Sequence, residues 1–189
     1  MFNFLVFLLT LAGMEVAAAL LHRHVMHGWG WRWHESHHRP RTGWFELNDC
    51  YALVFAAIAI VLIALGTSGY SPLQWVGAGM TAYGLLYFLV HDGLVHRRLP
   101  LGITPRSGYL KRLYQAHLLH HAVHTKDGAV SFGFLYAQKP AHLKRKLAQV
   151  QTATRSASRS AAQTPTRLGP PCAQAADHSL QSTARPDPE

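Results

Sequence analysis

Cysteine and acidic residues are scarce in this sequence. The 189 residues include only two cysteines, Cys50 and Cys172, at unrelated positions, which argues against a disulfide framework and a thiolate metal site. Nine Asp and Glu stand against eighteen Lys and Arg, so the formal net charge is +9. Charged residues make up only 14% of the chain, where roughly a quarter is usual for a soluble domain. No nucleic-acid-binding motif accompanies the basic charge, so its partner is more simply a membrane surface or an acidic protein.

Long apolar runs are present instead. Residues 1–21 contain one charged side chain, Glu15, and residues 50–66 and 72–90 contain no Asp, Glu, Lys, Arg or His. Each run is close to the roughly 20 residues that cross a bilayer as a helix. The first run could be a signal peptide, because it ends in the small residues VAAAL, but it lacks a basic start and its apolar stretch is too long. We therefore predict an all-α, multi-span integral membrane protein with spans at about 1–21, 50–66 and 72–90.

The basic residues predict the topology. All Lys and Arg lie either between the first and second runs or after the third. Three spans place both regions on one side, which the positive-inside rule identifies as cytoplasmic. All fourteen histidines fall on that side as well. We expect an inner-membrane location with the histidine motifs facing the cytoplasm.

The sequence also predicts a boundary near residue 150. Residues 151–189 consist mainly of Ala, Ser, Thr, Pro, Gln and Arg, with almost no large apolar side chains. Such a composition is typical of a disordered segment. The prediction is thus a membrane domain over 1–150 and a disordered tail over 151–189.

Ten of the histidines form a repeated pattern. A pair spaced as H-x4-H is followed by an H-x-x-H-H triplet, first after the first apolar run and again after the third. The ten residues are His22, His27, His34, His37, His38, His91, His96, His117, His120 and His121. On a helix with about 100° per residue the triplets project to one side. The pairs would lie about 140° apart, so they need a helix end or a distortion, for which Gly28 and Gly93 are candidates.

The first triplet, HESHH, can also be interpreted as the H-E-x-x-H zinc protease motif with Glu35 as general base. The second triplet, HLLHH, has leucine in place of that glutamate. A protease zinc needs three protein ligands, whereas ten histidines are placed here as if for two metals. Imidazole suits iron, copper and zinc, so the ligand type alone does not identify the metal.

The whole series resembles the membrane fatty-acid hydroxylase superfamily. The stretches HGWGWRWHESHH, VGAGMTAYGLLYFLVHDGLVH, GYLKRLYQAHLLHHAV and VSFGFLYA resemble its bacterial β-carotene 3-hydroxylase branch, in order from about Gly13 to Ala137. The resemblance implies a non-haem di-iron monooxygenase that uses O2 and reduced ferredoxin. It implies hydroxylation of C3 and C3′ of the β-ionone rings of β-carotene, through β-cryptoxanthin to zeaxanthin. It also implies that the ten histidines bind two iron ions.

Three carboxylates and one further histidine are candidates for supporting the metal ligands. Glu15 lies seven residues before His22 on the same helical face, and we expect it to accept a hydrogen bond from a ligand imidazole. Asp92 and Asp49 could act similarly. His124 lies seven residues after His117 and is expected near the same site or at the surface.

Three alternatives remain open at this point. One is a related oxygenase that acts on another membrane lipid, such as a sterol, a fatty acid or a keto-carotenoid. Another is a membrane metal-binding or transport protein, although transport ligands are expected within the spans, near the midplane. The third is a metal-dependent hydrolase that works without oxygen.

Overall fold

The computed structural model describes residues 1–41, 43–100 and 102–163, and every regular element in these ranges is a helix. The all-α prediction is confirmed. The tail prediction is wrong for residues 151–163, which belong to the long helix α6 (Pro140–Gln163). After Pro140 at its first position this segment contains neither glycine nor proline, so nothing interrupts the helix. Residues 164–189 of the predicted tail lie outside the described residues.

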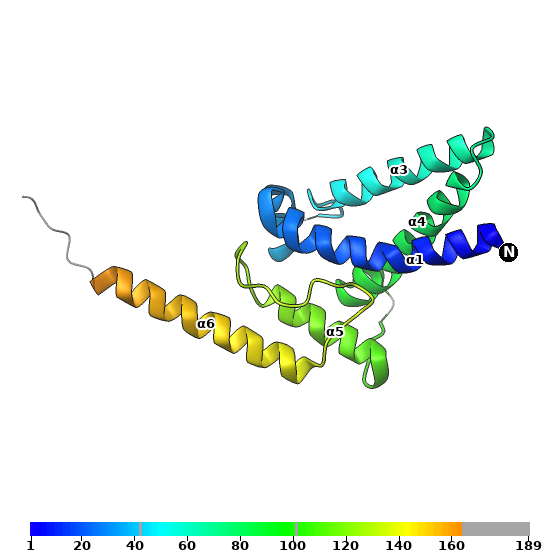
Figure 1. Ribbon diagram of the computed structural model, residues 1–189. Coiled ribbons are helices and arrows are strands. Elements are labelled where there is room, and N and C mark those ends of the chain that lie inside the picture. Colours follow the sequence, from blue (N-terminus) through cyan, green and yellow to red (C-terminus); the bar gives the residue numbers. More distant parts are fainter. Residues whose placement is uncertain (42, 101, 164–189) are drawn as a thin grey trace, which may run out of the picture.

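Within the described residues, three helices are long and apolar enough to cross a membrane, and they extend over Phe2–Trp29, Asp49–Thr67 and Leu73–Val95. Their α-helical parts are α1 (Phe2–Leu21), α3 (Asp49–Thr67) and α4 (Leu73–Tyr87), which coincide with the three apolar runs of the sequence. The first and third continue as π-helices, η1 (His22–Trp29) and η3 (Phe88–Val95). Figure 1 shows the N-terminus and the α3–α4 turn at one end of these helices, and the histidine-bearing segments lie toward the other end.

Helix α4 packs against both other apolar helices, and two glycines permit the close approach. A methyl group on Gly77 would lie 2.7 Å from the carbonyl oxygen of Ala59 in α3. A methyl group on Gly79 would lie 2.9 Å from the carbonyl oxygen of Phe7 in α1. Small residues at such crossings are typical of helices that associate within a bilayer. Helix α4 is therefore the central member of the three.

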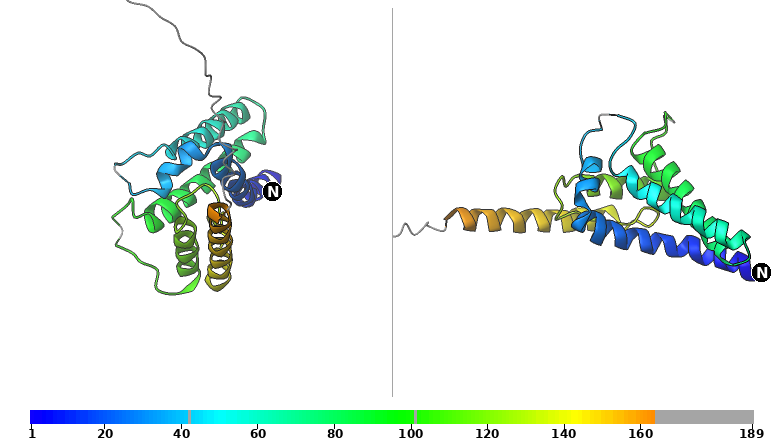
Figure 2. Two further views of the ribbon diagram at one scale, coloured as in Figure 1. Left: turned by 90° about the vertical axis from the view of Figure 1, so that its left-hand side faces the viewer. Right: turned by 90° about the horizontal axis from the view of Figure 1, so that it is seen from above.

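The remaining elements lie at the histidine-bearing end. The short helices α2 (Trp31–His34) and η2 (Glu35–His38) follow η1, and α5 (Gly108–His121) precedes the 122–139 segment and α6. Leu143 and Leu147 of α6 pack with Leu113 and Ala116 of α5 in a small apolar core. The second half of α6 projects away from the other helices, as Figure 1 and the right view of Figure 2 show.

Candidate metal centre

Five histidines from separate segments converge where the apolar helices end. They are His22, His27, His34, His38 and His120, and each offers a ring nitrogen within 4.8 Å of those of the others. All five side chains are buried. We call this set the first histidine group.

Four more histidines form a second histidine group beside the first. They are His37, His91, His96 and His117, and their ring nitrogens also lie within 4.8 Å of one another. The ring centroid of His37 lies 5.6 Å from that of His34, so the two groups are neighbours. All members except His96 are buried, and His96 is half-buried.

His121 lies between the groups. Its ring centroid is 4.5 Å from that of His38 and 4.5 Å from that of His117. Its Nε2 atom is buried and has no hydrogen-bond partner within the described part of the chain. A buried nitrogen without a partner is costly, and a cation beside it would accept its lone pair.

Both H-x4-H pairs are built on π-helical turns. The backbone N–H of His96 donates to the carbonyl oxygen of His91 at 2.9 Å, a bond between residues five apart. Because a π-helix joins residues five apart, this spacing returns both imidazoles to one side. The ring centroids are 5.3 Å apart for His22 and His27 and 4.6 Å apart for His91 and His96. The distortion expected from the sequence is thus a widened turn, and η1 also contains a kink at Gly28, whose φ of −111° and ψ of −126° are not helical.

The two triplets are divided between the groups. We expected the imidazoles of each H-x-x-H-H motif to project together. Instead His37 joins the second group while its neighbours His34 and His38 join the first. In the other triplet His117 and His120, nearly one helical turn apart, join different groups. The ring centroids lie 5.6 Å apart for His34 and His37 and 5.7 Å apart for His117 and His120, so residues on one helical face reach separate groups.

In most of these rings Nδ1 donates a hydrogen bond to an oxygen atom. In the first group the acceptors are uncharged: four backbone carbonyls and one side-chain amide. The Nδ1 contacts are His22 to Phe132 O (2.9 Å), His27 to Lys126 O (2.8 Å), His38 to Val123 O (2.8 Å), His120 to Val130 O (3.1 Å) and His34 to Asn48 Oδ1 (2.7 Å). In the second group the acceptors are carboxylates, Glu46 for His37 (3.0 Å) and Asp92 for His91 (2.6 Å). The segment after α5 therefore supplies four of the five uncharged acceptors.

These contacts fix which ring nitrogen carries the proton. A carbonyl or carboxylate oxygen can only accept, so Nδ1 is the donor and Nε2 holds a lone pair. Yet Nε2 atoms face each other at 3.0 Å in His22 and His34, at 3.2 Å in His27 and His120, and at 3.2 Å in His37 and His91. Two lone pairs at this distance repel unless a cation accepts both. The arrangement thus fits metal ions in each group.

Burial keeps these imidazoles neutral at neutral pH. It lowers the pKa of His34 to about 3, that of His38 to about 4 and that of His96 to about 3. The pKa values of His37, His117 and His120 are also lowered by burial and then by neighbouring histidines. Burial raises the pKa of Glu46, and the charge of Arg98 opposes this shift. Neutral imidazole is the form that binds a metal.

Asp92 accepts a hydrogen bond from an imidazole, that of His91, as the sequence predicted for a supporting carboxylate. Glu15 does not. Glu15 sits about 10 Å before His22 along α1, and instead of an imidazole it contacts Tyr83 and the backbone of residues 134–136. Asp49 pairs with Arg98 at 2.9 Å. His124 donates to the carbonyl oxygen of His38 at 2.8 Å, so it supports a histidine of the first group through its backbone.

Sequence reasoning missed Glu46 and Asn48. Both stand in the loop before α3, where no helical spacing links them to a histidine. It also missed the carbonyl acceptors of the 122–139 segment, because a backbone oxygen leaves no trace in residue identity. Glu46 is the single acidic residue between the first triplet and α3, and this position was the only signal available.

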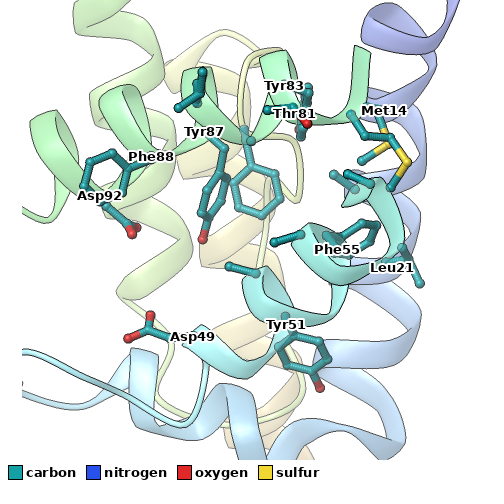
Figure 3. Close-up of a pocket in the computed structure, with 18 of the residues that line it drawn as sticks. Met14, Leu21, Asp49, Tyr51, Phe55, Thr81, Tyr83, Tyr87, Phe88 and Asp92 are labelled. Carbon is teal, nitrogen blue, oxygen red and sulfur yellow. The ribbon is translucent and has the colours of Figure 1, made fainter. Parts of the chain in front are cut away.

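An apolar cavity of about 430 Å³ lies between α1, α3 and α4. Its walls include Met14 and Leu21 of α1, Phe55 of α3 and Phe88 of η3, and Asp49 and Asp92 lie toward one end (Figure 3). Two aromatic residues connect it to the histidines. Phe134 stacks on His22 with centroids 5.0 Å apart, and Tyr87 stacks on His91 at 4.4 Å. The cavity therefore reaches the aromatic rings that stack on His22 of the first group and on His91 of the second.

Comparisons with known proteins agree with this geometry. The family model described as fatty acid hydroxylase matches residues 7–137, which include every histidine of both groups. A protein named beta-carotene hydroxylase from Pseudescherichia vulneris is 66% identical over 142 residues, covering 75% of this chain and 81% of the relative. Proteins of the same name from Pantoea ananas and a Paracoccus species are 61% and 52% identical, covering 84% and 78% of this chain and 91% of each relative. No solved structure matches the chain. The resemblance seen in the sequence is confirmed, and the chain belongs to the fatty acid hydroxylase family.

Proposed function

We propose that this chain is a non-haem di-iron monooxygenase that hydroxylates C3 and C3′ of the β-ionone rings of β-carotene. The product would be zeaxanthin, formed through β-cryptoxanthin with O2 as co-substrate. The observation that carries the proposal is the pair of adjacent histidine groups at the end of an apolar cavity between membrane-type helices. The names of the relatives support the carotenoid substrate.

The two iron ions would be held by the first and second histidine groups, with His121 available to either. Iron bound there would supply O2 activation and attack on an unactivated C–H bond, for which redox-inactive zinc is unsuited. The chain contributes neutral imidazoles in fixed orientation, because their Nδ1 hydrogen bonds set the tautomer and the ring plane. Burial of the groups excludes bulk water from the reacting position.

The cavity is suited to one end of a long hydrocarbon. Its volume of about 430 Å³ lies within the range of small-molecule pockets, about 300–1,000 Å³, and would take a ring rather than a whole C40 chain. Its walls come from the three apolar helices, so a substrate dissolved in the bilayer would reach it laterally. Phe134 and Tyr87, which stack on the histidines, would orient the ring against the metal positions.

The membrane placement and the electron donor complete the proposal. We place the protein in the inner membrane with both histidine groups on the cytoplasmic side, because the basic residues gather at that end of the helices. Reduced ferredoxin would bring the electrons, and exposed basic residues such as Arg39 and Lys111 would attract an acidic carrier.

The test is pigment chromatography in an aerobic bacterial host that accumulates β-carotene. Expression of this chain should yield zeaxanthin and β-cryptoxanthin, and His37→Ala should abolish both without loss of membrane expression. His142→Ala is the matched control, because His142 is exposed on α6 away from both groups, and it should leave the products unchanged. If only β-carotene remained with the wild-type chain present in the membrane, the carotenoid proposal would be wrong and another lipid substrate would take its place.

A further inference from the structure

The two histidine groups differ in the charge of the atoms that orient them. Each hydrogen-bonded imidazole of the first group donates to a carbonyl or amide oxygen. In the second group His37 donates to Glu46 and His91 donates to Asp92. Both acids are mostly buried, with side-chain exposures of 10%. The contrast divides the metal centre into an uncharged and an anionic half.

Arg98 joins the acids of the anionic half. Its guanidinium lies 3.4 Å from Glu46 Oε2, 2.9 Å from Asp49 Oδ1 and 3.5 Å from Asp92 Oδ2, and its own side chain is only 11% exposed. The backbone N–H of Arg98 also donates to the carbonyl oxygen of Asp92 at 2.8 Å. One cation among three carboxylates leaves two uncompensated negative charges when all are ionised. Arg98 therefore holds Glu46 and Asp92 in place without cancelling their charge.

A carboxylate acceptor changes what an imidazole gives to a metal. Drawing the Nδ1 proton toward a negative oxygen raises the electron density at Nε2, which strengthens its bond to a cation. The nearby negative charge adds direct attraction in a buried, low-dielectric site. A backbone carbonyl orients the ring but supplies no net charge. The two positions cannot then be equivalent, although both are built from histidines.

We propose that Glu46, Asp92 and Arg98 are positioning residues that make the second histidine group the tighter metal site. The first group, oriented by neutral oxygens, is the weaker and more readily emptied position. This inference rests on the proposed function, because it assumes that both groups bind metal.

The test measures metal release from the purified full chain in detergent. The protein is loaded anaerobically with ⁵⁷Fe(II) and titrated with a chelator, while Mössbauer spectra distinguish the two positions. Wild type should lose iron in two phases. The first phase should be iron from the first histidine group and the second phase iron from the second group. Glu46→Gln should lower the iron affinity of the second group about tenfold to a hundredfold, the usual effect of removing such a partner. It should shift only one of the two spectral components. Glu46→Asp should restore part of the loss.

Two further variants sharpen the test. Glu35→Gln is the matched control. Glu35, like Glu46, lies between α2 and α3, but its carboxylate pairs with the exposed Arg39 and not with a histidine. It should leave both phases unchanged. Asn48→Asp gives His34 a carboxylate acceptor, so it should raise the iron affinity of the first group. The two release phases should then occur at more similar chelator concentrations.

The outcomes separate the inference from the proposed function. If Glu46→Gln left both phases unchanged or weakened both equally, the inference would be overturned. If Glu46→Gln did not fold, Asn48→Asp would decide, because a first phase that failed to tighten would also overturn it. If wild type bound no iron, the proposed function itself would fail.

Discussion

Glu15 holds the loop that packs over the first histidine group, so its replacement should disturb a site that it does not touch. Each carboxylate oxygen accepts two hydrogen bonds. Oε1 accepts from the backbone N–H groups of Phe134 (3.0 Å) and Tyr136 (2.9 Å). Oε2 accepts from the N–H of Leu135 (3.0 Å) and the hydroxyl of Tyr83 (2.8 Å). The loop so held carries Phe134, which stacks on His22.

The cost of Glu15→Gln can be worked out from these four bonds. Glutamine keeps one accepting oxygen and replaces the other with an NH2 donor, so two donors lose their acceptor. An unsatisfied donor costs about 1–3 kcal/mol. Glu15 is only partly buried, so we take the lower part of the range, about 2–4 kcal/mol for two donors. Tyr83→Phe removes one donor and keeps the carboxylate, so it should cost about 1 kcal/mol.

The assay is thermal unfolding of the detergent-solubilised protein together with its iron content. Glu15→Gln should lower the Tm by at least about 4 °C, since 1 kcal/mol corresponds to about 2–4 °C for a chain of this size. It should also lower the iron content, because the released loop no longer holds Phe132 O against His22 Nδ1. Tyr83→Phe should shift the Tm less. A Glu15→Gln protein with wild-type Tm and iron content would refute the reasoning.

Three further predictions concern other features. Gly133→Ala should destabilise the protein by about 1–3 kcal/mol, because its methyl group would lie 2.6 Å from the Tyr136 carbonyl oxygen and 2.8 Å from Glu15 Oε1. The control in the same melting assay is Gly43→Ala, whose methyl group would meet no atom within 4 Å. Ala56→Phe should fill the cavity and reduce zeaxanthin formation with iron content retained, whereas Ala57→Phe, whose side chain is outside the cavity lining, should not; equal product from both would argue against this substrate position. Lowered pKa values at His34, His38 and His96 mean that the unfolded chain binds protons that the folded chain does not. The stability of the metal-free protein is then full above about pH 6.5 and falls by about 1.4 kcal/mol per pH unit for each histidine as the pH drops toward 4; a Tm that stayed constant from pH 7.5 to 5 would contradict this.

The sequence could predict the helices because their signal is local. Apolar runs of span length end at Leu21, Gly66 and Val90, and the structure has its apolar helices over the same stretches. Helix α6 was missed beyond residue 150 because composition was given more weight than the absence of glycine and proline. Local pattern therefore identified elements more reliably than their ends.

The histidines were found by their spacing, but their partners were not. His22 donates to a carbonyl 110 residues away, and His38 donates to one 85 residues away. No spacing rule connects positions so distant, and a carbonyl acceptor can belong to any residue type. The π-helical turns were also outside the reach of an ideal-helix argument, which could state only that a distortion was needed.

The repeat in the sequence is not a repeat in the metal centre. The first copy of the motif supplies four histidines of the first group but gives His37 to the second. The second copy supplies three histidines of the second group but gives His120 to the first. Each group therefore needs a residue from the other copy, and neither copy alone could assemble its full set. His37 and His120 belong to different groups, so their replacements should act on different positions. His37→Ala should consequently lower the iron held by the second group and His120→Ala that held by the first, and the double variant should lose iron from both.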